Sequence, residues 1–301
     1  MSAGGSSGRA AVHAAFGPWL AGIASIIIWG ATPAATKFAV QGIDAVAVGG
    51  LRTVIAGALV LPALFLLRLP LPGDRRGWIL LAVSSVSGFV AFPVLFSLAL
   101  AYTSTAHAGL ILAPLPILTG LIGAVVERRL PGGLWWVGVA LAFAGEAVLV
   151  GLRDAGGGEA TLTGDLLAFA AGGAVAGGYV AGSRLSPVIG TWSVTAWGAA
   201  IGAGLMLPVT TALSLRLDWS GAGTAAWAAT LYLAIFSSLL AYVAWYWALA
   251  AGGIVRISLL QFVQPIVTLI LAVLLFGETM TLPLLLSAAI ILSGVGIARR
   301  G

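Results

Sequence analysis

Two stretches of the 301-residue chain decide how it folds: APLPILTGLIGAVVERRL at residues 113–130 and QPIVTLILAVLLFGETMT at residues 264–281. Both are apolar and have proline in second place. In both, a glutamate follows that proline by 13 residues, Glu127 in the first stretch and Glu278 in the second. The stretches lie 151 positions apart, and weaker matches at nearly the same offset run along the chain. The sequence therefore reads as two related halves.

The composition predicts a membrane protein. Sixty per cent of the residues are hydrophobic and 8% are charged, whereas an ordinary soluble domain has roughly 25% charged residues. So few charges do not cover the surface of a soluble protein, which excludes a soluble enzyme or an ordinary nucleic-acid-binding domain. The net charge of +5 does not change this, because the arginines are spread between apolar runs and form no single patch.

The apolar runs predict ten membrane-spanning helices, since a span needs about 20 predominantly apolar residues. The predicted spans are residues 18–37, 45–67, 78–101, 105–126, 134–152, 164–183, 192–213, 225–250, 255–276 and 282–298. We predict four segments: a flexible N-terminal tail at 1–17, a first five-helix repeat at 18–152, a linker at 153–163 and a second five-helix repeat at 164–301. The first apolar run has no small-residue cleavage site, so it is expected to be a retained helix.

Five helices per half is an odd number, so the second half is expected to enter the membrane from the opposite side. The charges agree, because two arginines follow Glu127 whereas Thr279 and Met280 follow Glu278. With the N-terminus inside, ten basic residues lie in inner segments and three in outer segments, which predicts that both termini are cytoplasmic. This pattern is typical of the inverted repeats of secondary transporters.

The chain resembles the EamA-type ten-helix carriers of the drug/metabolite transporter superfamily. The matching pieces are Trp29-Gly30 followed by Lys37, then Arg52, AlaLeuAlaTyrThr from Ala99, both proline–glutamate stretches and the glycine-rich last span. The resemblance covers nearly all of residues 19–299 and implies export of small metabolites, amino acids foremost. It also implies a central cavity lined by the first, third, fourth, sixth, eighth and ninth helices. One departure is that Ala176, and no aromatic residue, corresponds to Trp29.

Interrupted spans in matching positions of two repeats indicate where a carrier binds its substrate. The first span contains TrpGlyAlaThrPro at residues 29–33, and the sixth contains GlyGlyAlaValAlaGlyGlyTyr at residues 172–179. Proline removes a backbone donor and frees a carbonyl one turn earlier. The predicted hinge residues are Gly30, Pro33, Pro114, Gly177, Gly178 and Pro265. For the glycines the alternative is close helix packing.

Aromatic rings with a polar group, and amides inside a span, suit a cavity for a small amphipathic solute. The predicted substrate-binding residues are Trp29, Thr32, Phe92, Phe96, His107, Tyr179, Tyr242, Tyr246, Gln261 and Gln264. The alternatives are an interfacial aromatic belt for the rings and interhelical hydrogen bonds for the amides.

Four ionisable residues of the predicted spans lie in the outer part of the bilayer: Lys37, Arg52, His107 and Glu146. Charges at this depth are costly and mark either pairs or proton pathways. Arg52 and Glu146 have opposite signs at similar depth, which favours a structural ion pair. The alternative is that Glu146 or His107 carries a coupling proton, since histidine titrates near neutrality.

The sequence argues against other classes of protein. It has no cysteine, two histidines and no HExxH motif, so we predict no catalytic residues, no cofactor and no metal. The expected partners are a small-molecule substrate and the lipid bilayer, with no nucleic acid, in a monomer or a homodimer. Thirteen arginines against one lysine indicate a GC-rich bacterial genome, so the expected location of this membrane protein is a bacterial inner membrane. The alternatives to metabolite export are export of cationic drugs, then a channel or an intramembrane enzyme.

Overall fold

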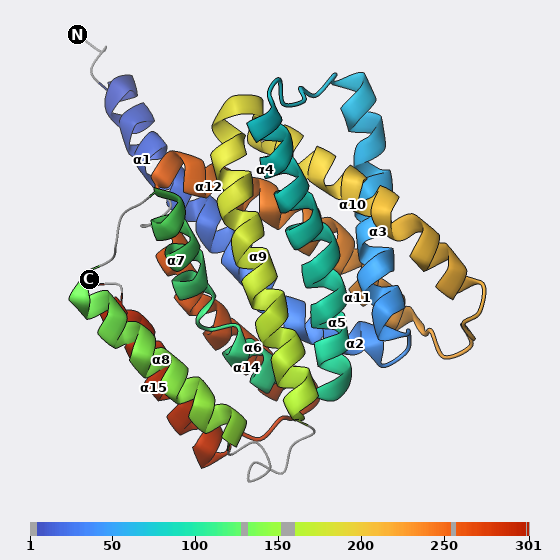
Figure 1. Ribbon diagram of the computed structural model, residues 1–301, viewed down its shortest axis with the longest axis vertical. Coiled ribbons are helices and arrows are strands. Elements are labelled where there is room, and N and C mark those ends of the chain that lie inside the picture. Colours follow the sequence, from blue (N-terminus) through green and yellow to red (C-terminus); the bar gives the residue numbers. More distant parts are fainter. Residues whose placement is uncertain (1–4, 128–131, 152–159, 254–256, 299, 301) are drawn as a thin grey trace.

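The structure is a computed structural model that describes residues 5–127, 132–151, 160–253, 257–298 and 300. These residues form helices and connections and contain no strand. Seven helices are long and apolar enough to cross a membrane. Three shorter apolar helices accompany them: Gly133–Leu149, Gln264–Phe276 and Leu282–Ala298. All of them run roughly along one direction as a bundle (Figure 1).

The elements of the first half are α1 (Gly5–Gly30), α2 (Thr32–Val40), α3 (Ala45–Leu66), α4 (Arg75–Val86), η1 (Ser87–Ala91), α5 (Phe92–Tyr102), α6 (Thr105–Ile111), α7 (Leu115–Glu127) and α8 (Gly133–Gly151). Those of the second half are α9 (Leu162–Ile189), α10 (Thr191–Ser214), α11 (Thr224–Tyr232), η3 (Leu233–Leu240), α12 (Ala241–Gly252), η4 (Leu259–Val263), α14 (Gln264–Phe276) and α15 (Leu282–Ala298).

The spans around the centre of the bundle are irregular. The first is interrupted at Ala31, just before Pro33, and the fourth leaves the helical path between α6 and α7, at Pro114. The ninth passes through the 3-10 helix η4 before Pro265. The third and eighth spans each contain a π-helix, η1 and η3. Irregular backbone at membrane depth is tolerated where protein surrounds it or a cavity adjoins it, so these breaks locate the centre of the molecule.

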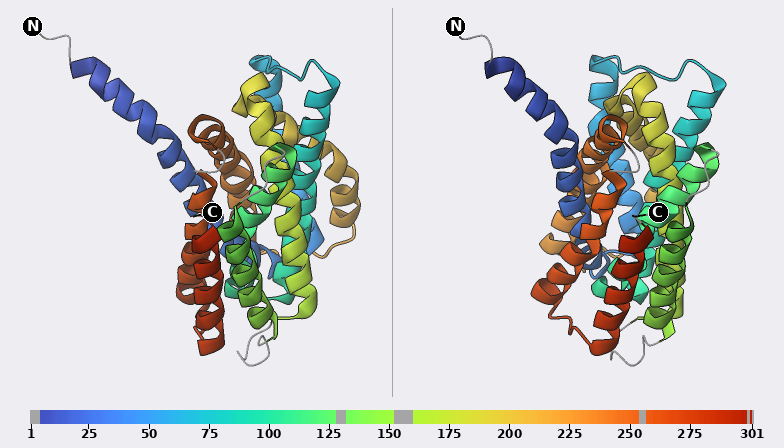
Figure 2. Two further views of the ribbon diagram at one scale, coloured as in Figure 1. Left: turned by 60° about the vertical axis from the view of Figure 1, so that its left-hand side comes forward. Right: turned by 90° about the vertical axis from the view of Figure 1, so that its left-hand side faces the viewer.

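Two features of the local structure concern the sixth span and the N-terminal segment. The sixth span, α9, runs without a break through Gly177 and Gly178. A β-carbon at Gly178 would lie 3.3 Å from Ser87 and Gly88, so this glycine permits close packing against η1. Helix α1 begins at Gly5 inside the predicted flexible tail, where alanines favour helix formation, and its N-terminal end projects from the bundle (Figure 2). The predicted linker lies mostly outside the described residues.

The helices pack across the two halves of the chain. The most extensive contacts join α8 to α15 and α3 to α10, and then α1 to α12 and α5 to α9. If the two halves of the chain are exchanged, the pairs α8–α15 and α3–α10 each map onto themselves. The pair α1–α12 then maps onto the pair α5–α9. A twofold relation between two repeats produces this pattern, which agrees with the repeat seen in the sequence.

The seam between α8 and α15 gives a test of this packing. A β-carbon at Gly138 would overlap the backbone of Gly294 and Ala298, whereas one at Gly133 on the same helix would meet open space. We therefore expect Gly138→Ala to push the helices apart and destabilise the protein by about 1–3 kcal/mol. Thermal unfolding in detergent, followed by circular dichroism, measures this, with Gly133→Ala as the matched control. Equal unfolding midpoints for Gly138→Ala and Gly133→Ala would contradict the close packing of α8 against α15.

Candidate functional site

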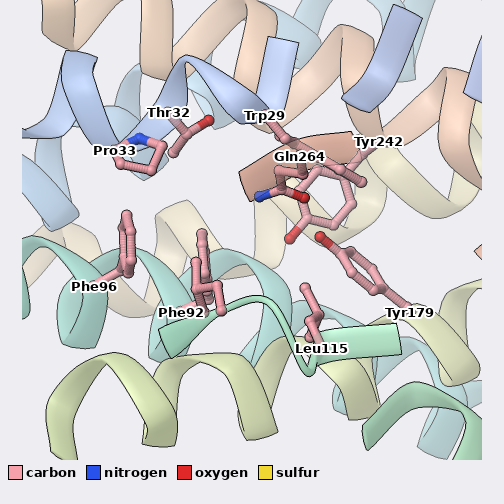
Figure 3. A pocket seen from close by; sticks show the side chains of 10 residues that line it. Trp29, Thr32, Pro33, Phe92, Phe96, Leu115, Tyr179, Tyr242 and Gln264 are labelled. Carbon is pink, nitrogen blue, oxygen red and sulfur yellow. The ribbon is translucent and has the colours of Figure 1, made fainter. Parts of the chain in front are cut away.

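A cavity lies where the broken spans meet. Its lining combines residues of both halves of the chain: Trp29, Thr32, Pro33, Phe92, Phe96, Leu112, Leu115, Tyr179, Tyr242 and Gln264. The aromatic rings and the amide of Gln264 gather around one space (Figure 3). About 320 Å³ of this space is free of atoms, but only about 10 Å³ admits the centre of a water molecule, which is room for about one water. A solute therefore needs these walls to move apart.

Trp29 is the centre of an aromatic cluster behind this cavity. Its ring stacks on Tyr179, with centroids 5.1 Å apart, and meets Tyr242 edge-on at 5.3 Å and Trp245 at 5.5 Å. Trp29 is 4% exposed, and its Nε1 donates to the carbonyl of Ser237 at 3.0 Å. Aromatic pairs with this geometry contribute about 0.5–1.5 kcal/mol each beyond burial, so the cluster holds the first, sixth and eighth spans together.

The break in the first span leaves backbone carbonyls that side chains of other spans satisfy. The Thr268 hydroxyl donates to the carbonyl of Gly30 at 2.8 Å, and the Tyr232 hydroxyl donates to the carbonyl of Ile28 at 2.8 Å. A β-carbon at Gly30 would overlap Val267, which explains why glycine stands there. The break is thus fixed by contacts to the eighth and ninth spans, as an irregular membrane helix requires.

Arg52 lies fully inside the bundle, 1% exposed, on α3. Its Nε and Nη2 donate to the Ser238 hydroxyl at 3.2 and 2.9 Å, and Nη2 also donates to the Ser237 hydroxyl at 3.1 Å. Its Cζ lies 6.0 Å from the centroid of the Phe92 ring. Helix α8, which contains Glu146, the predicted ion-pair partner of Arg52, lies on the opposite side of the bundle from α3 (Figure 1).

His107 instead has an acidic partner that the sequence analysis missed. Its Nε2 lies 2.9 Å from Oδ1 of Asp165, in the first turn of α9, and both side chains are at most 5% exposed. The two atoms are within ion-pair distance without forming an aligned hydrogen bond. On the same side of the bundle, the Glu278 carboxylate accepts from the backbone N–H groups of Thr105 and Ala106, both at 2.9 Å.

Seven of the ten predicted substrate-binding residues line the cavity, and three do not. His107 pairs with Asp165 as described. Tyr246 lies behind Tyr242, with its hydroxyl 2.9 Å from that of Ser84. Gln261 is buried at 2% exposure, and its amide has no hydrogen-bond partner within the described part of the chain. Pro33 lines the cavity, whereas nothing is described of the Glu146 side chain.

Five residues of this region were not predicted from the sequence: Leu112, Leu115, Asp165, Ser237 and Ser238. Asp165 and the consecutive polar pair Ser237-Ser238 stand inside otherwise apolar spans, and such residues usually face the bundle interior, so a signal existed for them. Leu112 and Leu115 have no such signal, because the spans contain many leucines and only the position of these two beside Pro114 is unusual. The Thr32 and Ser237 hydroxyls lie 3.0 Å apart, which connects the cavity wall to Arg52.

A second, wider groove opens on the side of the bundle beside the break in the first span. Its lining is apolar except for Tyr232: Ala31, Ala34, Ala35, Phe38, Ala225, Ala228, Ala229, Tyr232, Leu271 and Leu275. It encloses about 730 Å³ of space outside the atoms, part of it open to the surroundings. One of its lining residues, Ala31, directly precedes Thr32 and Pro33, which line the central cavity.

Comparison with known proteins agrees with this architecture. The EamA-like transporter family matches the chain twice, over residues 16–151 and 162–300. An uncharacterized transporter of Bacillus subtilis, YdeK, is 30% identical over 282 residues, which cover 94% of this chain and 96% of YdeK. An uncharacterized transporter of Archaeoglobus fulgidus is 26% identical over 253 residues, covering 82% of this chain and 85% of that protein.

A solved crystal structure has the same fold, with a TM-score of 0.65 at 23% identity, covering 93% of this chain and 95% of that one. The double family match and the relatives of nearly full length establish the class. The chain belongs to the EamA-like transporter family, as a multi-pass membrane protein built from two repeats. The resemblance stated from the sequence is confirmed.

Proposed function

We propose that the protein moves small metabolites, amino acids foremost, across a bacterial inner membrane by alternating access about the central cavity. The observation that carries this proposal is the closed cavity at the broken spans, which both halves of the chain line. Its walls combine aromatic rings, the amide of Gln264 and the hydroxyls of Thr32, Tyr179 and Tyr242, which suits a small amphipathic solute. Separating the two halves would open it to one side of the membrane.

The proposed topology has ten spans in two inverted repeats with both termini in the cytoplasm. The seven long apolar helices and three shorter ones support this number. The excess of basic residues on one side supports the orientation. Pro33, Pro114 and Pro265 are the proposed hinges, because each stands at an irregular part of its span. Gly177 and Gly178 remain predicted hinges within a helix that has no break.

The proposed coupling site is the buried His107–Asp165 pair, since ionisable side chains paired between spans are typical of proton relays in transporters. The charged groups near it are the Glu278 carboxylate at the start of α6 and Lys37, whose Nζ donates to the carbonyl of Thr103 at 3.2 Å. A protonatable pair between two spans fits a carrier driven by a proton gradient.

Uptake of a panel of labelled amino acids into proteoliposomes tests the proposal, with and without an imposed pH gradient. Saturable uptake of some members is expected, and accumulation above equilibrium under the gradient would establish proton coupling. Uptake that only reaches equilibrium identifies a facilitator, and the His107–Asp165 pair is then structural. No uptake of any amino acid contradicts the substrate class.

The second candidate is export of cationic drugs by the same fold. The observation that favours it is the aromatic wall of Trp29, Tyr179, Tyr242 and Phe92, since such faces bind cations. Adding labelled organic cations to the same panel distinguishes the two candidates. A channel or an intramembrane enzyme has no comparable supporting observation among the described residues.

A further inference from the structure

The guanidinium of Arg52 is a buried charge whose partners are all neutral. Within the described residues its hydrogen-bond partners are the hydroxyls of Ser237 and Ser238. Its Nη1 is buried and has no hydrogen-bond partner there. A charged side chain inside a membrane is ordinarily paired with an opposite charge or faces a wet cavity. Among the described residues, Arg52 therefore has a donor without an acceptor and no acidic hydrogen-bond partner.

This charge lies one layer behind the wall of the central cavity. Its Cζ is 6.0 Å from the ring centroid of Phe92, which lines the cavity. The Ser237 hydroxyl that accepts from Arg52 is also 3.0 Å from the hydroxyl of Thr32, another lining residue. Movement of Phe92 or Thr32 would thus bring a solute in the cavity within reach of the guanidinium.

The geometry around Arg52 is built by a special feature of the eighth span. Ser237 and Ser238 are consecutive residues of the π-helix η3, and both bond the same guanidinium. π-helical segments are frequently found at functional sites. The serines hold one edge of the planar group and leave Nη1 without a partner, so the orientation of the guanidinium is fixed before any ligand binds.

The two-repeat symmetry indicates that the fold itself does not need this arginine. The offset that pairs Pro62 with Pro208 places Gly198 at the position equivalent to Arg52. There the ring of Phe89 fills the corresponding space, 2.8 Å from where a β-carbon of Gly198 would lie. The equivalent interface of the second half is thus packed with an apolar ring. The buried charge of Arg52 has no equivalent at Gly198 in the second half, which points to a role other than stabilising the fold that the two halves share.

We infer that Arg52 binds the carboxylate of the transported solute, so that the substrates are carboxylate-bearing amphipathic molecules. This rests on the proposed function, because it assigns a substrate group to the same cavity. A guanidinium presents paired donors that match a carboxylate. The same charge disfavours organic cations: at about 6 Å and an effective dielectric constant of about 20, a positive solute would bind on the order of 100-fold more weakly than a neutral one.

The experiment measures binding and transport separately. Purified protein in detergent is titrated with phenylalanine, 3-phenylpropionate and phenylalaninamide, and the thermal unfolding midpoint is followed. The three probes share an aromatic ring, and only the amide lacks the carboxylate. The same probes then compete with uptake of a labelled amino acid into proteoliposomes. The variants are Arg52→Gln and Arg52→Lys, with Arg216→Gln, an exposed arginine in the loop before α11, as the matched control.

We expect the two carboxylates to stabilise the wild-type protein at concentrations at least about 10-fold lower than the amide. The ratio of the stabilising concentration of the amide to that of the carboxylates should fall close to one in Arg52→Gln and remain unchanged in Arg216→Gln. Equal effects of carboxylate and amide on the wild-type protein would overturn the inference. So would the absence of stabilisation by either carboxylate, or a folded Arg52→Gln variant that keeps the ratio.

If Arg52→Gln does not fold, the inference is tested by the comparison of probes on the wild-type protein and by Arg52→Lys. Arg52→Lys keeps the positive charge but loses the paired donors, so it should lower the ratio of amide to carboxylate concentrations. Stabilisation by carboxylates without uptake of any solute would contradict the proposed function and leave the site standing. If a labelled amino acid is taken up and phenylalaninamide competes with it as well as the carboxylates do, the proposed function stands and the role of Arg52 is contradicted.

Discussion

Replacing Trp29 by alanine is expected to lower uptake by at least about tenfold and to destabilise the protein by about 3–5 kcal/mol, the range measured for buried tryptophans. The ring closes one wall of the cavity and contacts Tyr179, Tyr242 and Trp245. Its loss also leaves the carbonyl of Ser237 without its indole donor. Proteoliposome uptake per amount of folded protein, together with denaturant unfolding, measures both effects.

Three further variants separate transport from stability. Trp29→Phe keeps a ring but loses the N–H, so it should retain more stability than Trp29→Ala. Gln264→Ala, at a half-buried residue of the lining, should lower uptake with little change in stability. Trp192→Ala is the control, since this tryptophan is 59% exposed and should leave both quantities unchanged. Wild-type uptake by folded Trp29→Ala and Gln264→Ala would contradict the cavity assignment.

The second large effect is expected at Asp165. Asp165→Asn keeps the size of the side chain but removes the charge that faces His107 at 2.9 Å. If this pair carries the coupling proton, accumulation driven by a pH gradient should fall to the equilibrium level, whereas downhill uptake should persist. His107→Gln should have the same effect, and the double variant should be no worse than either single one, because the residues act as a unit.

Asp218→Asn is the matched control, since Asp218 is an exposed carboxylate in the loop before α11. It should leave gradient-driven uptake unchanged. Gradient-driven accumulation that survives in folded Asp165→Asn would show that the buried pair is structural. In that case the effect of the substitution would be confined to stability.

The sequence alone predicted the parts of the fold that depend on local chemistry. Apolar length indicated the spans, and proline indicated where they are irregular, because it removes a backbone donor wherever it stands. The breaks beside Pro33, Pro114 and Pro265 follow from this. The chemistry of aromatic and polar side chains inside spans predicted ten cavity residues, and seven of these ten line the observed cavity.

The sequence did not predict which residues meet across the bundle. Arg52 was assigned to Glu146 by depth and sign alone, but the rotation of α3 about its axis directs the guanidinium to the serines of η3. His107 meets Asp165 because α6 and α9 are neighbours, which no local pattern reveals. The π-helices also have no signature in the residue order, since their extra residue per turn is stabilised by packing.

The pairing of helices across the two halves also shapes how the protein is made. The main partners of α1, α3 and α8 are α12, α10 and α15, all of them synthesised later. At about 5–20 residues per second, the first half waits in the lipid for roughly 10–30 seconds before its partners arrive. Its small-residue surfaces at Gly57 and Gly138, which fit against α10 and α15, face acyl chains during that time. The packed interior between the two halves therefore cannot be complete before α15 has been inserted beside α8.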